Sequence, residues 1–597
     1  MAPLRGLAGF LLAFTLIACG KAIEVHQGLL DATIEDLQAG MRQGFYTSLD
    51  LVNAYTARIS EVNNELRAVT EINPDAWDIA FSLDQDRQRG HIRGTLHGIP
   101  ILVKDSIGTF DKMNTTAGTY ALLGTQTQKD AMVVKKLRDA GAVILGKTNL
   151  SQFSGYRSRN SSNGWSAYGG QATGPYYPNQ DPSGSSSGSA VAAALALSLG
   201  ALGTETNGSI ILPAAKAAVV GIKPTVGLTS RYNVVPVSPF RDTVGPIAPT
   251  VKDAAYMLQV IMGSDVDDEA TLFTPYQNTV TIPKYVDACD PNALQGTRIG
   301  VPDLALIRYW QGGFISLTEV HAFYAALDEL EAAGAEVVRE ANIRDFDKMF
   351  YHDRNDTLIA GIELGMQGRS TFDAYLRNVL WNPKHLWDLH AVVEIMKEDP
   401  REEYPERDTA FIDYALNLNL KKTSPQYLKA VKAIEELGAE TGGLLGTLRV
   451  ENLTAVVLPT SISHRIAAYA NAPVVTVPMG YFPKGNEVVK TSWGLVERAE
   501  GIPFGIAFMG NPWKEQTLIG LAYAYEQRTQ WRKKRKLHVA PTTNVIGKNI
   551  NVEVVTEPPT TNGTGKNINI EVVTEPPATN VPGKNVTIEV VAAPPSP

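Results

Sequence analysis

Two hydrophobic patterns follow one another along the chain and predict its elements. Residues 48–62 place apolar side chains three or four positions apart, and Ser48 can cap the resulting helix. Residues 98–105 and 142–149 are nearly continuous apolar runs, which are typical of buried strands. Residues 131–140, between these runs, have a helical pattern. This strand–helix–strand order predicts an α/β fold in which helices pack on a sheet.

The rest of the chain repeats this alternation with longer helices. Residues 157–188 are rich in Gly, Ser, Asn and Pro and predict a loop, and residues 190–197 predict a closely packed helix of small residues. Residues 315–440 are mostly helical in pattern, and we expect them to cover the core and shape substrate access. Residues 454–459 and 473–478 predict two late core strands.

Both ends of the chain differ from this pattern. Residues 1–20 combine Arg5 with an apolar stretch that is too short to span a bilayer, which predicts a signal peptide and a secreted protein. Lipid attachment through Cys19 is the alternative. Glycosylation sequons fit the secretory route, among them those that begin at Asn114, Asn160, Asn355 and Asn452; the triplet at Asn207 overlaps the proposed nucleophile and should be unmodified.

The last part of the chain, residues 541–597, contains three copies of an 18-residue repeat. Each copy has a Gly-Lys-Asn triplet followed by Glu-Val-Val and Pro-Pro. Copies this short and rich in proline cannot bury a core, so we expect a flexible or extended appendage. Short β pairing among the copies is the alternative. One catalytic domain is then expected over residues 23–540.

Composition narrows the function classes. The chain has 597 residues, of which 44% are apolar and 19% charged, so a large core can be buried. A net charge of −8 without a long basic run argues against a nucleic-acid partner. The two cysteines, Cys19 and Cys289, predict neither a disulfide framework nor a cysteine-rich metal site. The oligomeric state stays open.

Candidate chemistry centres on Ser209, which lies downstream of a serine-dense turn at residues 183–189. A serine hydroxyl is a poor nucleophile until a base removes its proton. No histidine lies between His97 and His321, so Lys104, at the end of an apolar run, is the more plausible base.

These motifs resemble the amidase signature family, of the secreted fungal type. The resemblance rests on the runs at 98–105 and 140–149, the serine-rich turn, and the segments at 203–213, 220–225 and 242–248. It implies a large mixed β-sheet sandwiched between helices in a single catalytic domain. It also implies hydrolysis of the carbon–nitrogen bond of a small-molecule amide, without a metal or organic cofactor.

The resemblance assigns roles by motif. Lys104 is the base, Ser185 is the bridging serine with a cis peptide bond to Gly184, and Ser209 is the nucleophile. A lysine acts as a base only when neutral, and burial disfavours its charged form. The implied oxyanion-hole donors are the backbone N–H groups of Thr206, Asn207, Gly208 and Ser209. The residues expected to support Lys104 are Ser186, which would orient it, and Asp105.

Three residues around the proposed nucleophile depart from the family pattern, and Ser183 and Ser187 stand where the serine-rich turn usually has glycine. Asn207 replaces a glycine and would add bulk beside the oxyanion hole, and Ile211 replaces an arginine whose acidic partner would correspond to Glu205. We therefore expect either a neutral or apolar substrate or reduced activity. The alternatives are a catalytically impaired binding protein, an esterase or acyl transferase, and a G-x-S-x-G nucleophile at Ser186.

Overall fold

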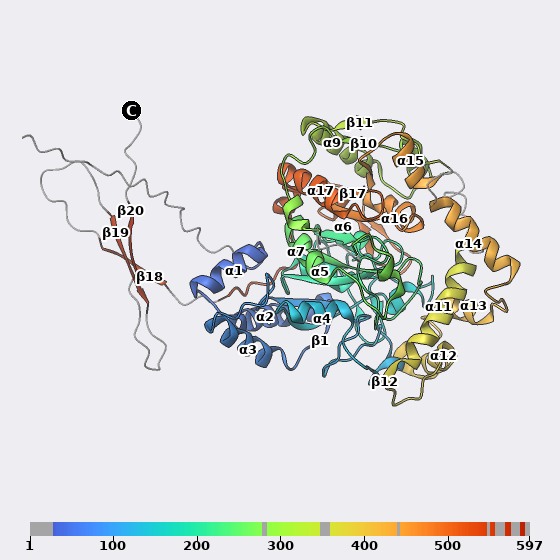
Figure 1. Ribbon diagram of the computed structural model, residues 1–597, viewed down its shortest axis with the longest axis horizontal. Coiled ribbons are helices and arrows are strands. Elements are labelled where there is room, and N and C mark those ends of the chain that lie inside the picture. Colours follow the sequence, from blue (N-terminus) through green and yellow to red (C-terminus); the bar gives the residue numbers. More distant parts are fainter. Residues whose placement is uncertain are drawn as a thin grey trace, which may run out of the picture.

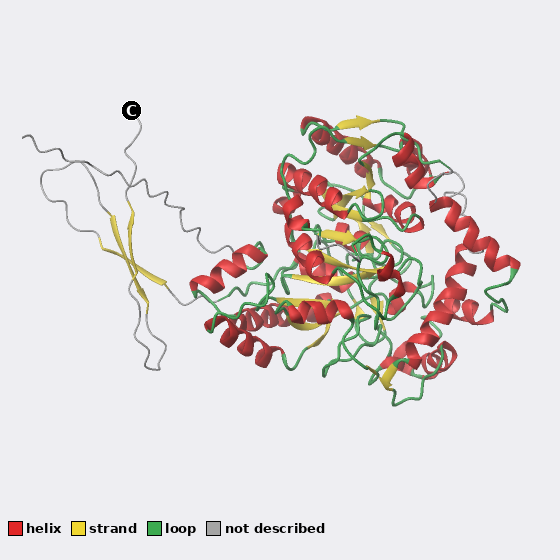
Figure 2. Ribbon diagram, viewed as in Figure 1, coloured by secondary structure: helices red, strands yellow, loops and turns green. Residues whose placement is uncertain are grey.

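A mixed sheet of 11 strands forms the centre of the computed structural model, and helices cover it (Figures 1 and 2). The described residues are 28–276, 283–344, 346, 359–438, 442–545, 550–555, 568–574 and 586–590. The strands, in sheet order, are β1 (Val69–Ile72), β4 (Val143–Thr148), β2 (Pro100–Lys104), β7 (Gly200–Glu205), β9 (Thr243–Ala248), β8 (Val220–Lys223), β14 (Val474–Tyr481), β17 (Pro503–Met509), β13 (Ala455–Pro459), β10 (Arg298–Gly300) and β11 (Glu336–Val338).

Strand β2 occupies the position in the sheet that matters most for the site. It runs parallel to both β4 and β7, and all residues of the three strands are buried. Strands covered on both faces read as nearly continuous apolar runs, which is why the sequence predicted β2 and β4. The carboxyl ends of these parallel strands lie at the same edge, so Lys104 and the end of β7 come together there.

The helices around the sheet include those predicted at residues 48–62, 131–140 and 190–197. They are α1 (Ile34–Gln43), α2 (Ser48–Leu66), α3 (Ala76–Gln88), α4 (Met132–Asp139), α5 (Ser187–Ala194), α6 (Ile211–Lys216), α7 (Val251–Ile261), α8 (Asp303–Gln311), α9 (Leu317–Ala332), α15 (Gly443–Val450), α16 (Thr460–Tyr469) and α17 (Glu515–Thr529). Helix α5 is buried along its whole length against β7, because its residues are small enough for close packing.

A separate group of helices forms one side of the molecule (Figure 1). It comprises α11 (Ile359–Arg377), α12 (Leu389–Glu398), α13 (Ala410–Asn417) and α14 (Pro425–Gly438). Side chains from α11 to α13 form a second hydrophobic cluster with Leu122, Phe153 and Tyr156 of the core domain. This cluster confirms the helical prediction for much of residues 315–440.

Short elements complete the domain. They are β3 (Gln126–Thr127), β5 (Trp165–Ser166), β6 (Gly170–Gln171), β12 (Val379–Trp381), β15 (Val489–Lys490), β16 (Val496–Arg498) and the 3-10 helices η1 (Tyr120–Leu122), η2 (Gln152–Gly155), η3 (Glu269–Phe273), η4 (Tyr285–Ala288), η5 (Pro400–Glu402) and η6 (Trp531–Lys534). Within the described ranges, no helix is long and apolar enough to cross a membrane.

The proposed signal peptide, residues 1–20, lies outside the described residues. The tail repeats supply one strand each, in an antiparallel sheet of β18 (Ile550–Val555), β19 (Ile568–Thr574) and β20 (Val586–Val590). These strands correspond to the β pairing among the copies that was the alternative for the repeats.

The boundary expected at residue 540 also moves. Thr542 and Thr543 donate backbone hydrogen bonds to the carboxylate of Glu61 in α2. The guanidinium of the buried Arg58 donates to the carbonyl of Thr543 at 2.5 Å, and the Leu29 N–H donates to the side chain of Asn544. Residues 541–545 therefore belong to the catalytic domain.

Candidate active site

Lys104 ends strand β2 with its side chain completely buried. Its Nζ donates to Ser185 Oγ at 2.7 Å, to Thr204 Oγ1 at 2.8 Å and to the Thr204 carbonyl at 3.3 Å. Burial lowers the pKa of Lys104 to about 7, against the opposing effect of the carboxylates of Asp242 and Glu205. A large share of this amine is therefore neutral near pH 7 and can accept a proton.

Ser185 lies in the turn that leads into α5, and its peptide bond with Gly184 is cis, as the resemblance implies. The Ser185 carbonyl accepts a hydrogen bond from the Ser151 N–H at 3.1 Å. The next residue, Ser186, donates its N–H to the Ser209 carbonyl at 3.1 Å. This main-chain contact ties the turn of the bridging serine to the turn of the nucleophile.

Ser209 lies just before α6 and is 8% exposed, in the wall of a cavity that Ser185 also lines. Among the described residues, no hydrogen bond joins the hydroxyl groups of Ser209 and Ser185. The structure thus brings Lys104, Ser185 and Ser209 to one place. Lys104 contacts Ser185 directly, and Ser209 faces the open space that a substrate would enter.

Glu205 organises the turn before the nucleophile. Its buried carboxylate accepts the backbone N–H groups of Gly208 at 2.8 Å, Ile210 at 2.7 Å and Ile211 at 3.1 Å. Sequence reasoning treated Glu205 as the partner of a missing arginine. Its actual partners are these main-chain donors, with the buried Lys223 acting on it electrostatically.

This arrangement corrects one of the expected oxyanion-hole donors. The N–H of Gly208 points to Glu205 and is already occupied. The N–H groups of Thr206, Asn207 and Ser209 have no acceptor in the part of the chain that the structure describes. They stay the predicted donors for a developing oxyanion.

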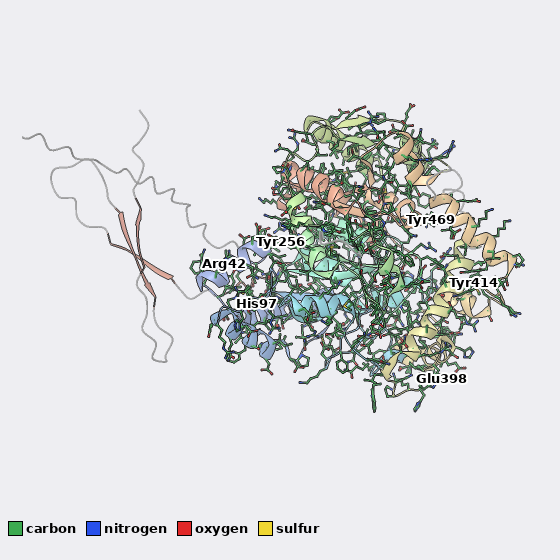
Figure 3. The ribbon with its side chains drawn as sticks, viewed as in Figure 1. Arg42, His97, Tyr256, Glu398, Tyr414 and Tyr469 are labelled. Atoms are coloured by element: carbon green, nitrogen blue, oxygen red, sulfur yellow. The ribbon has the colours of Figure 1, made fainter. Side chains whose placement is uncertain are left out.

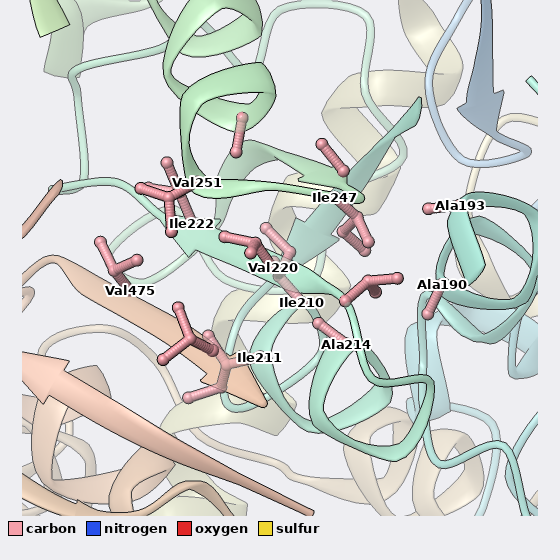
Figure 4. Close-up of a cluster of buried hydrophobic side chains, with 14 of the residues drawn as sticks. Ala190, Ala193, Ile210, Ile211, Ala214, Val220, Ile222, Ile247, Val251 and Val475 are labelled. Carbon is pink, nitrogen blue, oxygen red and sulfur yellow. The ribbon is translucent and has the colours of Figure 1, made fainter. Parts of the chain in front are cut away.

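The two replaced positions have simple structural explanations. Gly208, and not Asn207, has a left-handed backbone, with φ of 84°, so the glycine-specific conformation is retained. Ile211 is fully buried in the hydrophobic cluster that also contains Ile222 and Val475 (Figure 4). Position 211 therefore does not face the cavity, and the loss of arginine there carries no information about substrate charge.

The two residues expected to support Lys104 act differently from the prediction. Ser186 Oγ donates to the Thr204 carbonyl at 3.1 Å, so it reaches Lys104 only through Thr204. Asp105 accepts hydrogen bonds from the N–H and hydroxyl of Thr116, and the nearby Lys147 acts on it electrostatically. Burial raises the pKa of Asp105 to about 6.

Thr204 is the functional residue that sequence reasoning missed. It supplies two of the three hydrogen-bond acceptors of Lys104 and is held in place by β7. The available signal was a buried polar residue at the end of an otherwise apolar strand. It could be interpreted only once β7 was known to lie beside β2.

The cavity has a volume of about 450 Å³, and polar and apolar atoms contribute equally to its exposed wall. Most of its lining residues are serine, asparagine, glutamine or arginine, while Leu364 of α11 and Tyr469 of α16 add apolar surface. Tyr469 is labelled in Figure 3. Two lining arginines form buried ion pairs, Arg157 with Glu402 at 2.7 Å and Arg241 with Glu363. Residues of the helical side thus complete the cavity wall.

Other candidate chemistry is weaker. No group of three or more His, Cys, Asp or Glu suited to a metal ion occurs in the described ranges, and Cys289 is a free thiol. The rival nucleophile Ser186 is fully buried, and its hydroxyl is engaged with the main chain of Thr204.

Comparisons with known proteins show the family of the chain. The Amidase family model matches residues 50–519. A relative from Arthroderma benhamiae, named as an amidase, is 46% identical over 540 residues, with 87% of this chain and 89% of that protein covered. The native peptide amidase of Stenotrophomonas maltophilia is 36% identical, with a TM-score of 0.74 and coverage of 86% and 99%. An amidase family protein of Bacillus anthracis is 30% identical, with a TM-score of 0.73 and coverage of 85% and 93%. The chain belongs to the amidase signature family and is an amidase.

Proposed function

We propose that the protein hydrolyses the carbon–nitrogen bond of a small, polar amide through an acyl-enzyme on Ser209. The observation that carries this proposal is the 2.7 Å hydrogen bond between Lys104 and Ser185 beside a cavity lined by Ser209. The pKa of Lys104, lowered to about 7, makes its amine a usable base near neutral pH.

The reaction has two halves. Ser209 Oγ attacks the substrate carbonyl, and its proton passes through the Ser185 hydroxyl to Lys104 Nζ. Backbone N–H groups at residues 206, 207 and 209 receive the negative charge that develops on the carbonyl oxygen. The proton then returns through Ser185 to the departing nitrogen. Water attacks the resulting ester by the same relay and releases the acid.

The residues that line the cavity bear on the polarity of the substrate more directly than the sequence pattern does. The expectation of a neutral or apolar substrate rested on Ile211, which packs in the core instead. Most lining residues carry hydroxyl, amide or guanidinium groups, which can hydrogen-bond a polar substrate. The departures at residues 207 and 211 also give no structural reason for impaired catalysis.

Hydrolysis of a small primary amide by matched variants tests this function. Ser209→Ala should reduce kcat by about 10⁴-fold or more, because the acyl-enzyme cannot form. Ser186→Ala, the matched change at the rival serine, should lower kcat far less than Ser209→Ala, because its hydroxyl reaches Lys104 only through Thr204. Wild-type turnover in Ser209→Ala would refute the mechanism, and loss of turnover only in Ser186→Ala would move the nucleophile.

We further propose that the protein is secreted. The composition of residues 1–20 supports this, as do sequons at Asn160 and Asn452, which are both exposed. Asn355 lies outside the described residues. Expressed in a yeast, the protein should appear in the medium without residues 1–20 and lose mass on treatment with an N-glycosidase. Full-length, unglycosylated protein retained in the cells would contradict secretion.

A further inference from the structure

Asn207 has a side chain as well as a backbone amide at the site. It is half-buried, lines the same cavity as Ser209, and stands where the family pattern has glycine. Its Oδ1 lies 3.3 Å from Nδ1 of His464. His464 comes from α16, the helix that also contributes Tyr469 to the cavity wall.

The chemistry of this contact fixes which group of Asn207 remains available. In the orientation in which Asn207 Oδ1 faces the ring, Nδ1 of His464 carries the hydrogen and donates it, because an amide oxygen only accepts hydrogen bonds. Burial lowers the pKa of His464 to about 3, so the ring stays neutral and keeps one N–H. With Oδ1 engaged, the amide nitrogen Nδ2 is left, and it has no acceptor within the described residues.

Position relative to the nucleophile indicates which part of the substrate Nδ2 meets. Asn207 is two residues from Ser209, on the same turn held by Glu205. The acyl group stays bonded to Ser209 Oγ after the amine has departed, and we therefore assign the cavity wall at Asn207 to the acyl side. A donor left free in such a wall is complementary to an acceptor on the ligand.

We propose that Asn207, oriented by His464, donates a hydrogen bond from Nδ2 to an acceptor oxygen on the acyl part of the substrate. The enzyme then selects amides whose acyl group carries a second carbonyl close to the scissile one. Asn207 is a specificity-determining residue and His464 is a positioning residue that acts through it. This inference rests on the proposed function, since it assigns the acyl side by the ester on Ser209.

Two primary amides separate the effect from general reactivity. N-acetylphenylalaninamide and 3-phenylpropanamide release the same ammonia and share a benzyl group, but only the first has an extra carbonyl. The preference, measured as the ratio of their kcat/KM values, should fall about tenfold in Asn207→Gly, which is the loss of one hydrogen bond. Asn471→Gly, at an exposed asparagine outside the cavity lining, is the matched control and should keep the wild-type preference.

The role of His464 has its own readout. His464→Phe should lower the preference as Asn207→Gly does, and His464→Gln, which retains a donor, should restore most of it. The double variant Asn207→Gly/His464→Phe should lose no more than Asn207→Gly alone, because both changes remove one interaction. Thermal unfolding of each variant checks that the fold is intact.

Binding to a variant that cannot turn over separates this inference from the proposed function. In the Ser209→Ala background, calorimetry should show tighter binding of N-acetylphenylalaninamide than of 3-phenylpropanamide, and Asn207→Gly should remove the difference. An unchanged preference in both assays would overturn the role of Asn207. An equal loss for both amides would overturn it too, because Asn207 would then act on the scissile carbonyl. If Asn207→Gly removes the binding preference but turnover does not depend on Ser209, the Asn207 contact is supported and Ser209 is not the nucleophile.

Discussion

At the scale of single residues, the proposed catalysis depends on the protonation state of Lys104. Its side chain is buried at the end of β2, and burial outweighs the two carboxylates that favour the charged form. Thr204 accepts hydrogen bonds from Nζ through its carbonyl and hydroxyl oxygens, while Ser185 Oγ accepts from the charged amine and donates to the neutral one, so Nζ is held toward Ser185 in either protonation state. The surroundings of the Lys104 Nζ atom therefore determine both its position and its ability to accept a proton.

The pH dependence of kcat/KM follows from this pKa. Because the base must be neutral, activity should rise with pH, reach half its maximum near the pKa of about 7, and level off above it. Lys104→Arg should be inactive across the same range, since a guanidinium does not release its proton. A midpoint near 10.5, the ordinary lysine value, would contradict the lowering of the Lys104 pKa by burial, and an unchanged pH profile in Lys104→Arg would show that Lys104 is not the base.

At the scale of elements, the turn between β7 and α6 has to hold one shape. Gly208 has φ of 84°, and a Cβ there would lie 2.6 Å from Leu212 Cδ1 and 3.1 Å from His464 Cβ. The clash would displace the adjoining residues that carry the nucleophile and the oxyanion donors.

Gly208→Ala tests the turn against a matched glycine. Gly485 has φ of 82°, and a Cβ added there would have nothing within 4 Å, so Gly485→Ala should cost only about 1 kcal/mol and leave activity intact. Gly208→Ala should destabilise the fold and also lower kcat about 100-fold, because small displacements of the reacting groups slow the reaction. Equal activities of the two variants in a steady-state assay would contradict this role of the turn.

The helical side is joined to the core by buried ion pairs. Glu402, at the end of η5, accepts from Arg157, Thr119 and Gln152 of the core domain. Arg157 lines the cavity, so this junction both stabilises the fold and shapes the site.

Glu402→Gln should reduce the free energy of unfolding by about 3 kcal/mol, because the buried Arg157 loses its compensating charge. Glu398→Gln is the matched control at an exposed residue of α12 (Figure 3), and it should change stability by less than about 0.5 kcal/mol. Denaturant unfolding measures the free energy of unfolding of both variants. Similar losses in the two variants would show that the Arg157–Glu402 ion pair does not stabilise the junction.

At the scale of the whole molecule, the last residues of the catalytic domain close it onto α2. A chain ending after residue 545 keeps the contacts of Thr542, Thr543 and Asn544, whereas one ending after residue 540 leaves the buried Arg58 short of an acceptor. The first truncation should unfold at the same denaturant concentration as the full chain. The second truncation should reduce the free energy of unfolding by about 2 kcal/mol. Equal stability of the two truncations would place the boundary back at residue 540.

The sequence predicted the features that are encoded locally. Lys104, Ser185 and Ser209 each sit in a short motif, and the apolar runs of β2 and β4 indicate strands without any tertiary knowledge. Thr204 and Glu205 were missed or misassigned because their roles depend on how β7 pairs with β2 and how the next turn folds back. The Arg157–Glu402 pair joins residues 245 positions apart, which no local pattern reveals.

The most direct test of the central claim is labelling with a fluorophosphonate followed by peptide mapping. The account predicts one labelled residue, Ser209, with labelling abolished in Ser209→Ala and strongly slowed in Lys104→Ala. Label on Ser186, or undiminished labelling when Lys104 is replaced, would contradict a serine activated by a buried neutral lysine.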